Sequence, residues 1–307
     1  MNKTLRAIIS VLIVLGLVVL LGFAIAGHIY NNNARHICKT ASLLLEQKDY
    51  EGAIKAYEKI ITSFSKSSSL IKAELGLAGA YVDSGRLTQA RDIYKNILSR
   101  DLEFNVAKSI SEKLGELNIK ILFSPTKTAD SIIYKVHDKD TLESIAKRYN
   151  TTASLIKRAN NIKGFIKPGT DLKVVTGKLS IVVDKSQNTL TLKSSSDEAQ
   201  AGEEVVKIYA VSTGANNSTP VGSFKIVNKI MDPPWFSNGK VILPQDPKNI
   251  LGSRWMGFDI RSYGIHGTTD DASIGTQCTQ GCVRMHNSDV EELYDIVPLG
   301  TEVTVVD

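Results

Sequence analysis

Cysteine is scarce in this chain of 307 residues: there are three, so they cannot all pair with one another. A chain of this length can bury a hydrophobic core without a disulfide framework. With 8 prolines and 22 glycines, a collagen-like or low-complexity chain is excluded. Hydrophobic residues at 42% and charged residues at 22% are ordinary globular values, which argues against wholesale disorder. The length favours about two domains, or three if some are small.

The formal net charge of +5 conceals an uneven distribution of charge along the chain. Residues 1–125 carry a net charge of +5, residues 126–178 carry +6 and residues 179–307 carry −6. A basic middle beside an acidic end predicts separate modules with separate partners. No nucleic acid is expected among these partners.

A long apolar run lies near the N-terminus. Ala7 to Gly27 is 21 residues without a charge, preceded by Lys3 and Arg6. As a helix rising about 1.5 Å per residue it reaches roughly 31 Å, close to the hydrocarbon thickness of a bilayer. A cleaved signal peptide has a shorter apolar region, although Ala24-Ile25-Ala26 resembles a cleavage site. The length favours an uncleaved membrane anchor over residues 1–33, and the flanking charges leave its orientation open.

A helical repeat is expected over residues 34–122. The pattern Tyr50-x-x-Ala53-x-x-x-Tyr57 returns 37 positions later as Leu87-x-x-Ala90-x-x-x-Tyr94. Apolar residues at this spacing mark one face of a helix, and small alanines allow helices to approach. The second copy resembles a tetratricopeptide repeat, although both copies lack its closing proline. A plain helical spacer is the alternative. Two repeats either bind a protein partner or only hold the next modules away from the membrane.

Residues 132–176 have the pattern of a small, basic strand–helix–helix–strand module. Tyr134 begins an alternation of apolar and polar residues that is typical of a strand. Asp140 or Thr141 can cap the helix that follows. Pro168-Gly169 marks the turn before the closing strand. This βααβ order resembles a LysM domain. The resemblance implies binding to N-acetylglucosamine-containing glycan strands, in peptidoglycan or chitin. The loop residues that we expect to contact glycan are Asp140, Thr141, Asn160 and Ile162.

The last part of the chain, residues 179–307, consists of short β-type runs separated by turns, which indicates a β-rich sandwich or barrel-like domain. Its candidate chemistry lies in two glycine-framed segments, Gly264-Ile265-His266-Gly267 and Gly281-Cys282-Val283-Arg284. A free thiol is mostly protonated at neutral pH, so a nucleophilic cysteine needs a neighbouring base, usually histidine. The 16 positions between His266 and Cys282 let a loop bring imidazole to sulfur. The other histidines show no metal-ligand spacing, and no metal or other cofactor is expected.

These segments, with Thr219-Pro220-x-Gly222 and Leu251-Gly252-x-Arg254-Trp255, resemble the L,D-transpeptidase catalytic domain over nearly all of residues 179–306. The resemblance implies that Cys282 is the nucleophile, that His266 is the general base and that the carbonyl of Gly267 orients the imidazole. It implies an oxyanion hole made by the amides of Gly281 and Cys282. The substrate-binding residues that it implies are Tyr263, Arg254, Trp255, Arg284 and Asn287. Gln280 departs from the family, because many members have histidine there.

The sequence therefore predicts a multidomain α+β chain, with a transmembrane helix, helical repeats, a LysM module and a β-rich catalytic domain. The resemblance implies an extracytoplasmic enzyme that joins peptidoglycan stem peptides in 3→3 cross-links through a Cys282 thioester and that carbapenems acylate. Attack by water on the same thioester would make an L,D-carboxypeptidase, and a non-catalytic peptidoglycan tether is a further alternative. Cys278 is expected to be an inert, buried thiol, because the family that the sequence resembles usually has a small or aliphatic residue there. A redox protein that uses Cys278 and Cys282 is disfavoured, since the C-x-x-C spacing is missing.

Overall fold

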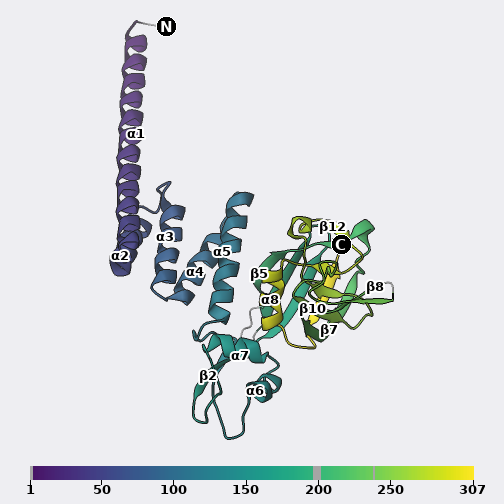
Figure 1. Ribbon diagram of the computed structural model, residues 1–307. Helices are drawn as coiled ribbons and strands as arrows, with labels where there is room; N and C mark the ends of the chain where they lie inside the picture. Colours follow the sequence, from purple (N-terminus) through teal and green to yellow (C-terminus); the bar gives the residue numbers. More distant parts are fainter. Residues whose placement is uncertain (1–2, 196–201, 238) are drawn as a thin grey trace. The chain divides into compact units, whose positions relative to one another are not determined.

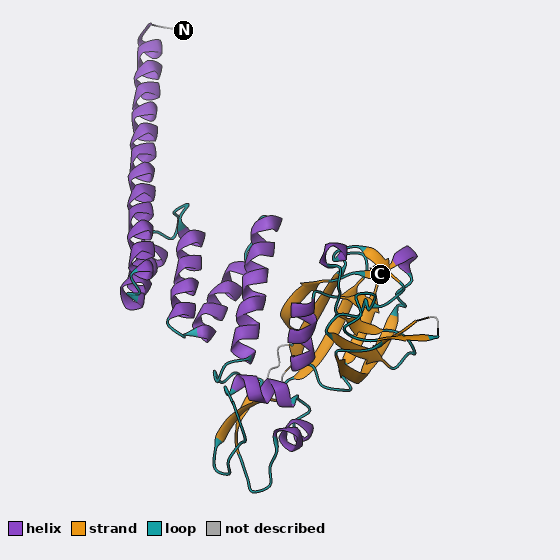
Figure 2. Cartoon of the chain, viewed as in Figure 1, coloured by secondary structure: helices purple, strands orange, loops and turns teal. Residues whose placement is uncertain are grey.

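The computed structural model describes residues 3–195, 202–237 and 239–307. The chain forms two compact units, Met1–Ser111 and Glu112–Asp307. Helices build the N-terminal part, and strands predominate in the C-terminal part (Figure 1, Figure 2). The first two residues of the expected anchor lie outside the described part of the chain.

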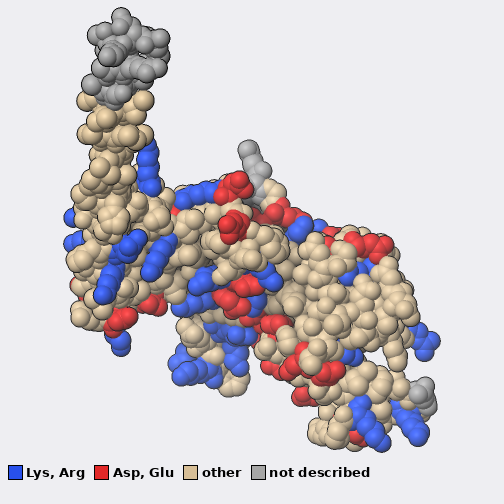
Figure 3. All heavy atoms as spheres, turned by 90° about the horizontal axis from the view of Figure 1, so that it is seen from above, with Lys and Arg blue, Asp and Glu red and all other residues tan. Residues whose placement is uncertain are grey.

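Helix α1 (Lys3–Glu46) joins the apolar run to the first repeat without a break. It is long and apolar enough to cross a membrane, and its apolar stretch from Leu12 is exposed. Figure 3 shows the helix next to its grey N-terminal end as uncharged surface. Further along the same helix, Ala34, Cys38 and Ala41 are buried against the repeats. The expected anchor and the first repeat helix are therefore one continuous element.

The helical repeats have the spacing that the sequence predicts. Ala53 and Tyr57 on one helix, and Ala90 and Tyr94 on another, are buried at equivalent positions. The Asp49 carboxylate caps the first of these helices by accepting a hydrogen bond from the Gly52 amide at 3.0 Å. The first four helices pack successively on one another, which buries one apolar face of each. The helices after α1 are α2 (Tyr50–Ser63), α3 (Leu70–Asp83), α4 (Leu87–Leu98) and α5 (Phe104–Leu122).

The small module, called the βααβ module below, follows α5. Its order is β1 (Ser131–Lys135), α6 (Leu142–Arg148), α7 (Ala153–Ala159) and β2 (Asp171–Val175), with the two strands antiparallel. Thr141 and Ser144 form a capping box at the start of α6, which is why this helix begins there. The predicted strand–helix–helix–strand pattern is confirmed.

The C-terminal domain is built on an eight-stranded curled sheet with the order β13-β11-β10-β7-β14-β3-β4-β5. Two neighbouring pairs, β11 with β13 and β14 with β3, are parallel, and the others are antiparallel. The strands are β3 (Lys178–Asp184), β4 (Thr189–Ser195), β5 (Glu204–Ala210), β7 (Gly222–Met231), β10 (Arg254–Phe258), β11 (Gly264–His266), β13 (Val283–Arg284) and β14 (Glu302–Val306). Two small ladders, β6 (Thr213–Gly214) with β12 (Gln277–Thr279) and β8 (Trp235–Ser237) with β9 (Lys240–Ile242), stand outside this sheet.

Helix α8 (Asn287–Ile296) packs on this sheet and carries Val290, Leu293 and Ile296 into the core. The same core includes Leu155 from α7 and Leu122 from α5. The βααβ module and the C-terminal domain therefore share buried surface. Beyond the core, the Arg158 guanidinium pairs with the Asp295 carboxylate at 2.9 Å across the two modules.

Candidate active site

Two adjacent parallel strands bring the candidate nucleophile and base together. In their register Ile265 of β11 lies opposite Val283 of β13, and His266 lies opposite Arg284. Cys282 directly precedes β13, so its backbone lies beside Gly264. His266 is two positions further along the neighbouring strand. The loop between them spans 16 positions, and the parallel pairing closes it.

The Cys282 thiol is partly buried and faces the loop that precedes β11. Its Sγ donates a hydrogen bond to the Ser262 carbonyl at 3.4 Å, and among the described residues no hydrogen bond joins it to His266. Burial raises the pKa of this thiol above its ordinary value, and a backbone hydrogen bond from Gly264 and the charge of Arg284 oppose that rise. The thiol is therefore in its neutral form at neutral pH.

His266 is buried and held by the backbone. Its Nδ1 lies 2.6 Å from the Gly267 carbonyl, and because a carbonyl only accepts, Nδ1 carries the proton. The basic lone pair of the neutral ring is thus on Nε2. Burial lowers the pKa of His266 to about 4, hydrogen bonds to the backbone of Gly267 and Leu251 oppose this, and the Arg284 cation adds to it. The Trp255 ring stacks on the imidazole, with centroids 6.1 Å apart.

The turn before Cys282 is organised by Thr279. Its hydroxyl donates to the Cys282 carbonyl at 2.7 Å and accepts from the Gly281 amide at 3.1 Å. The Gly281 amide, an expected oxyanion donor, thus already has an acceptor, and its role at the oxyanion stays a prediction. Gly281 has a φ of +119° and faces the Tyr263 ring, so a side chain here would be strained and would collide. Sequence reasoning missed Thr279, whose signal is a hydroxyl three residues before the cysteine.

Cys278 is exposed, so the expectation that this thiol is buried is wrong. In the described part of the chain its strand β12 pairs with the short β6, outside the main sheet, and the side chain faces solvent. The guanidinium Nη1 of Arg284 lies 3.7 Å from the Cys278 sulfur and donates to the Ser273 hydroxyl at 3.0 Å. The Nε of Arg284 is buried and has no partner among the described residues. The Arg284 side chain thus extends from β13 toward Ser273 and Cys278, and its Nε is a buried donor without a partner among the described residues.

Of the other expected substrate residues, Tyr263 and Trp255 lie beside the Cys282–His266 pair and Arg254 does not. The Tyr263 ring packs against Gly281 beside the nucleophile, and Trp255 covers His266 while its Nε1 donates to Asn228 at 2.9 Å. Arg254 instead donates to its neighbour's carbonyl and lies over the Tyr294 ring of α8 at 5.5 Å. The structure therefore groups the first two with the Cys282–His266 pair and directs Arg254 toward α8.

Asn287, an expected substrate residue, uses its side-chain amide to hold nearby backbone, and a substrate contact stays a prediction. Its Oδ1 accepts hydrogen bonds from the amides of Ser253 and Thr268, each at 3.1 Å, and its Nδ2 donates to the Thr268 carbonyl at 2.7 Å. A Cβ on Gly252 or Gly267 would collide with this amide. Asn287 thus fixes the segment that carries the Gly267 carbonyl and, through it, the His266 ring.

The polar residues expected to contact glycan use their side chains inside the βααβ module. The Asp140 carboxylate accepts from the Tyr134 hydroxyl at 2.6 Å and from the His137 amide at 2.8 Å. Thr141 caps α6 with its hydroxyl, which accepts from the Ser144 amide at 3.0 Å. Glycan contact through these two side chains stays a prediction.

Asn160 and Ile162 are also engaged. Asn160 makes two hydrogen bonds of 2.8 Å with the backbone of Lys173, one as donor and one as acceptor, and so ties α7 to β2. Ile162 packs against the core of the module. These contacts shape the loop after α7, and glycan binding there would rely on its backbone and on other side chains.

Comparison with protein families gives three matches. They are a tetratricopeptide repeat over residues 44–111, a LysM domain over 134–175 and an L,D-transpeptidase catalytic domain over 178–305. YkuD of Bacillus subtilis (strain 168) is 32% identical over 182 residues, covering 57% of this chain and 98% of YkuD. YqjB of the same organism is 36% identical over 133 residues, covering 41% of this chain and 70% of YqjB. The solved L,D-transpeptidase from Mycobacterium smegmatis aligns at 19% identity and a TM-score of 0.35, over 47% of this chain and 65% of that one. The family matches confirm all three resemblances seen in the sequence.

Proposed function

Because the chain belongs to the L,D-transpeptidase family, we propose that it cross-links peptidoglycan by acyl transfer through Cys282. The family implies a tetrapeptide stem as donor. The Cys282 sulfur bonds to the carbonyl carbon of the third, diamino-acid residue, and the C–N bond to the terminal D-alanine breaks. The amine of a neighbouring stem then attacks the thioester, which forms a 3→3 amide cross-link and frees the thiol.

The observation that carries this proposal is the buried, backbone-held His266 on the strand beside Cys282. A neutral thiol and a neutral imidazole favour general-base catalysis over a preformed ion pair. The thiol turns from the Ser262 carbonyl toward Nε2, which takes its proton as the sulfur–carbon bond forms. The imidazolium then returns that proton to the amine of the leaving D-alanine.

One group is assigned to the negative charge that develops on the carbonyl oxygen, and another to the substrate carboxylate. We assign the Cys282 amide to the oxyanion, since the Gly281 amide is occupied by Thr279. Arg284 is assigned to a stem carboxylate. Its buried Nε has no acceptor among the described residues, and an unpaired buried donor costs free energy that a bound carboxylate would recover.

The remaining modules fit a place at the cell wall. Helix α1 serves as the membrane anchor, and the rest of the chain lies outside the cytoplasmic membrane, where peptidoglycan is. The βααβ module, a LysM domain, holds the glycan strand. A protein partner for the tetratricopeptide repeats stays a prediction.

The reaction can be tested with residues 28–307 and a disaccharide-tetrapeptide, followed by mass spectrometry. We expect free D-alanine together with a dimer joined between third residues, and neither product from Cys282→Ala. Tripeptide without dimer would identify an L,D-carboxypeptidase, because water would then be the acceptor. A folded protein that releases no D-alanine would refute the enzymatic proposal and leave the tether.

A further inference from the structure

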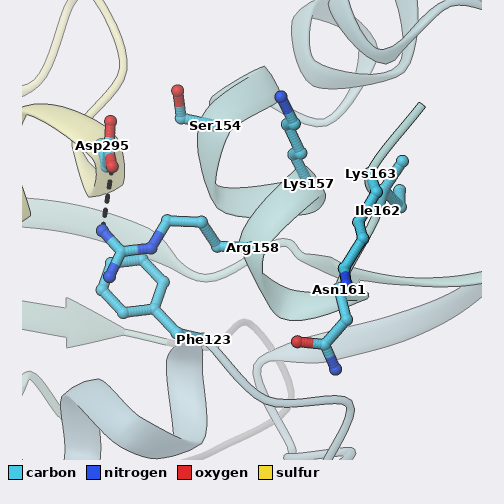
Figure 4. A pocket seen from close by; sticks show the side chains of 8 residues that line it. All are labelled: Phe123, Ser154, Lys157, Arg158, Asn161, Ile162, Lys163 and Asp295. Atoms are coloured by element: carbon cyan, nitrogen blue, oxygen red, sulfur yellow. Dashed lines mark hydrogen bonds and ion pairs between the residues drawn. The ribbon is translucent and has the colours of Figure 1, made fainter. Parts of the chain in front are cut away.

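Arg284, the residue assigned to a stem carboxylate, lies in a polar cluster that is separate from the pocket beside α7. In that pocket (Figure 4), Arg158 lies over the Phe123 ring and pairs with the Asp295 carboxylate, and the pocket includes part of the loop after α7. The cluster around Arg284 instead joins β13 to a single turn of 3₁₀-helix, η2 (Asp271–Ser273), in the segment between β11 and β12. Ser273, the last residue of η2, makes this connection.

The backbone of Ser273 is fixed by two hydroxyl groups. Its carbonyl accepts a hydrogen bond from the Ser212 hydroxyl at 2.6 Å and another from the Thr276 hydroxyl at 2.7 Å. Ser212 is fully buried, and it exchanges two backbone hydrogen bonds of 2.8 Å with Arg284. The backbones of Ser273 and Arg284 are therefore tied to the same buried residue, which fixes how far apart they lie.

The Ser273 hydroxyl has a defined polarity. Its oxygen lies 2.6 Å from the Asp270 carbonyl oxygen and 3.0 Å from Nη1 of Arg284. A carbonyl only accepts and a guanidinium only donates, so the hydroxyl proton points to Asp270 and a lone pair points to Arg284. Ser273 is thus an acceptor held ready for one nitrogen of the guanidinium.

This contact decides which edge of the guanidinium is free. A guanidinium binds a carboxylate best through two parallel N–H groups on one edge. Nη1 is engaged by Ser273 and also lies 3.7 Å from the Cys278 sulfur. Within the described ranges Nε is buried without a partner and Nη2 makes no hydrogen bond. The edge formed by Nε and Nη2 is therefore the one that can pair with a carboxylate.

A second contact ties η2 to the chain just after Arg284. The Asp271 carboxylate lies 2.7 Å from Nδ1 of His286, which carries a proton because a carboxylate only accepts. The side chains of this pair are 73% and 38% exposed, and exposed ion pairs stabilise little. Ser273 is half-buried and touches the guanidinium directly. It is therefore the residue of η2 expected to control the direction of Arg284.

We propose that Ser273 is a positioning residue for Arg284 and that it presents the Nε–Nη2 edge to a carboxylate of the donor stem. Without the hydroxyl, Nη1 loses its acceptor and the long side chain of Arg284 gains freedom to rotate. Ordering that side chain on binding would then cost conformational entropy that the native site has already lost. The proposal rests on the proposed function, which supplies a stem whose carboxylate meets Arg284.

The test is binding of a tetrapeptide with a diamino acid at its third residue, measured by calorimetry on the full chain in detergent. All variants carry Cys282→Ala, which prevents turnover. Ser273→Ala should raise the dissociation constant about tenfold, the effect of weakening one contact of a charged group. Ser273→Thr keeps the hydroxyl and should restore binding. Ser180→Ala removes a hydroxyl that donates to Glu203 at 2.8 Å, away from Arg284, and should change binding little.

Two comparisons separate positioning from general damage to the loop. Ser273→Ala/Arg284→Ala should bind no more weakly than Arg284→Ala, because Ser273 acts through Arg284. A tetrapeptide with its carboxylates amidated should bind more weakly than the acid, and Ser273→Ala should not weaken it further. Additive losses in the double variant, equal weakening of both peptides, or failure of Ser273→Thr to restore binding would overturn the proposal.

Release of D-alanine is measured separately on the chain with Cys282 intact. Ser273→Ala should raise KM and leave kcat within about twofold, since Ser273 does not touch the reacting atoms. A fall in kcat with KM unchanged would also overturn the positioning role. Absence of D-alanine from the wild-type reaction would refute the proposed function, while the binding results would still decide the role of Ser273.

Discussion

Acidification should destabilise the C-terminal domain through His266. The residue is 2% exposed, and burial lowers its pKa from the ordinary 6.5 to about 4, against hydrogen bonds to the backbone of Gly267 and Leu251. The unfolded chain therefore binds a proton near pH 6.5, whereas the folded domain binds it only near pH 4. The contribution of neutral His266 to the stability of the folded domain is complete above pH 6.5 and is lost as the pH falls through 4.

The size of the effect follows from the two pKa values. Each pH unit between them removes about 1.4 kcal/mol, so His266 accounts for about 3 kcal/mol of the free energy of unfolding lost between pH 6.5 and 4. His266→Gln keeps a hydrogen-bonding side chain but takes up no proton. Between pH 6.5 and 4 its free energy of unfolding should therefore fall by about 3 kcal/mol less than that of the wild type. Ile265→Val, beside it on β11, costs about 1 kcal/mol at every pH and should keep the wild-type slope.

The measurement is urea unfolding of residues 28–307 at pH 7, 5.5 and 4, followed by tryptophan fluorescence. The two tryptophans of the chain, Trp235 and Trp255, both lie in the C-terminal domain, so the signal reports the unfolding of that domain. Equal pH slopes for the wild type and His266→Gln would refute the assignment of a buried, neutral imidazole.

Four further predictions concern the reaction. Cys282→Ala and His266→Ala should each abolish release of D-alanine from a folded protein. Release by the wild type should persist as the pH falls to about 5, because the pKa of His266 is about 4. Arg284→Ala should raise KM for the stem and slow alkylation of Cys282 by iodoacetamide much less than His266→Ala does; a loss as large as that of His266→Ala would contradict a positioning role. A carbapenem should acylate Cys282 and not Cys278, since only Cys282 adjoins His266, and peptide mapping of the adduct checks this. Asn287→Ala should lower kcat at least tenfold, and Asn287→Asp, which keeps the acceptor of the Ser253 and Thr268 amides, should lower it less.

Local patterns along the sequence predicted the elements well. The 37-residue offset between Ala53 and Ala90 identified two repeat helices, since burial of one helical face requires that spacing. The glycine-framed segments around His266 and Cys282 predicted the pair because the chemistry of a cysteine nucleophile requires a nearby base. The repeat helices depend on residues close in sequence, and the His266–Cys282 pair is recognised from the residue types and glycines of two motifs taken together.

The sequence leaves open the directions of side chains and backbone groups, which tertiary packing decides, and the expected burial of Cys278 was wrong for this reason. Cys278 has apolar character, but its strand pairs outside the main sheet and so exposes it. The Gly281 amide donates a hydrogen bond to the Thr279 hydroxyl, a contact that the sequence does not indicate. Arg254 and Asn287 belong to the motif, yet their groups serve α8 and a backbone segment respectively. No spacing in the sequence distinguishes a side chain that faces substrate from one that faces its own fold.

Helix α1 leaves no joint between the apolar run and the repeats. The Tyr30 ring lies 5.0 Å from the Phe64 ring, and its hydroxyl accepts from the Lys66 amide at 3.3 Å, only three residues after Gly27. At about 1.5 Å per residue, a bilayer that holds the run to Gly27 would draw the loop after α2 into its headgroup layer. The repeats would also turn with the span as one body, by about 100° for each residue inserted after Gly27. If α1 spans a membrane, its rotation about its own axis would therefore set which face of the repeats lies toward the bilayer.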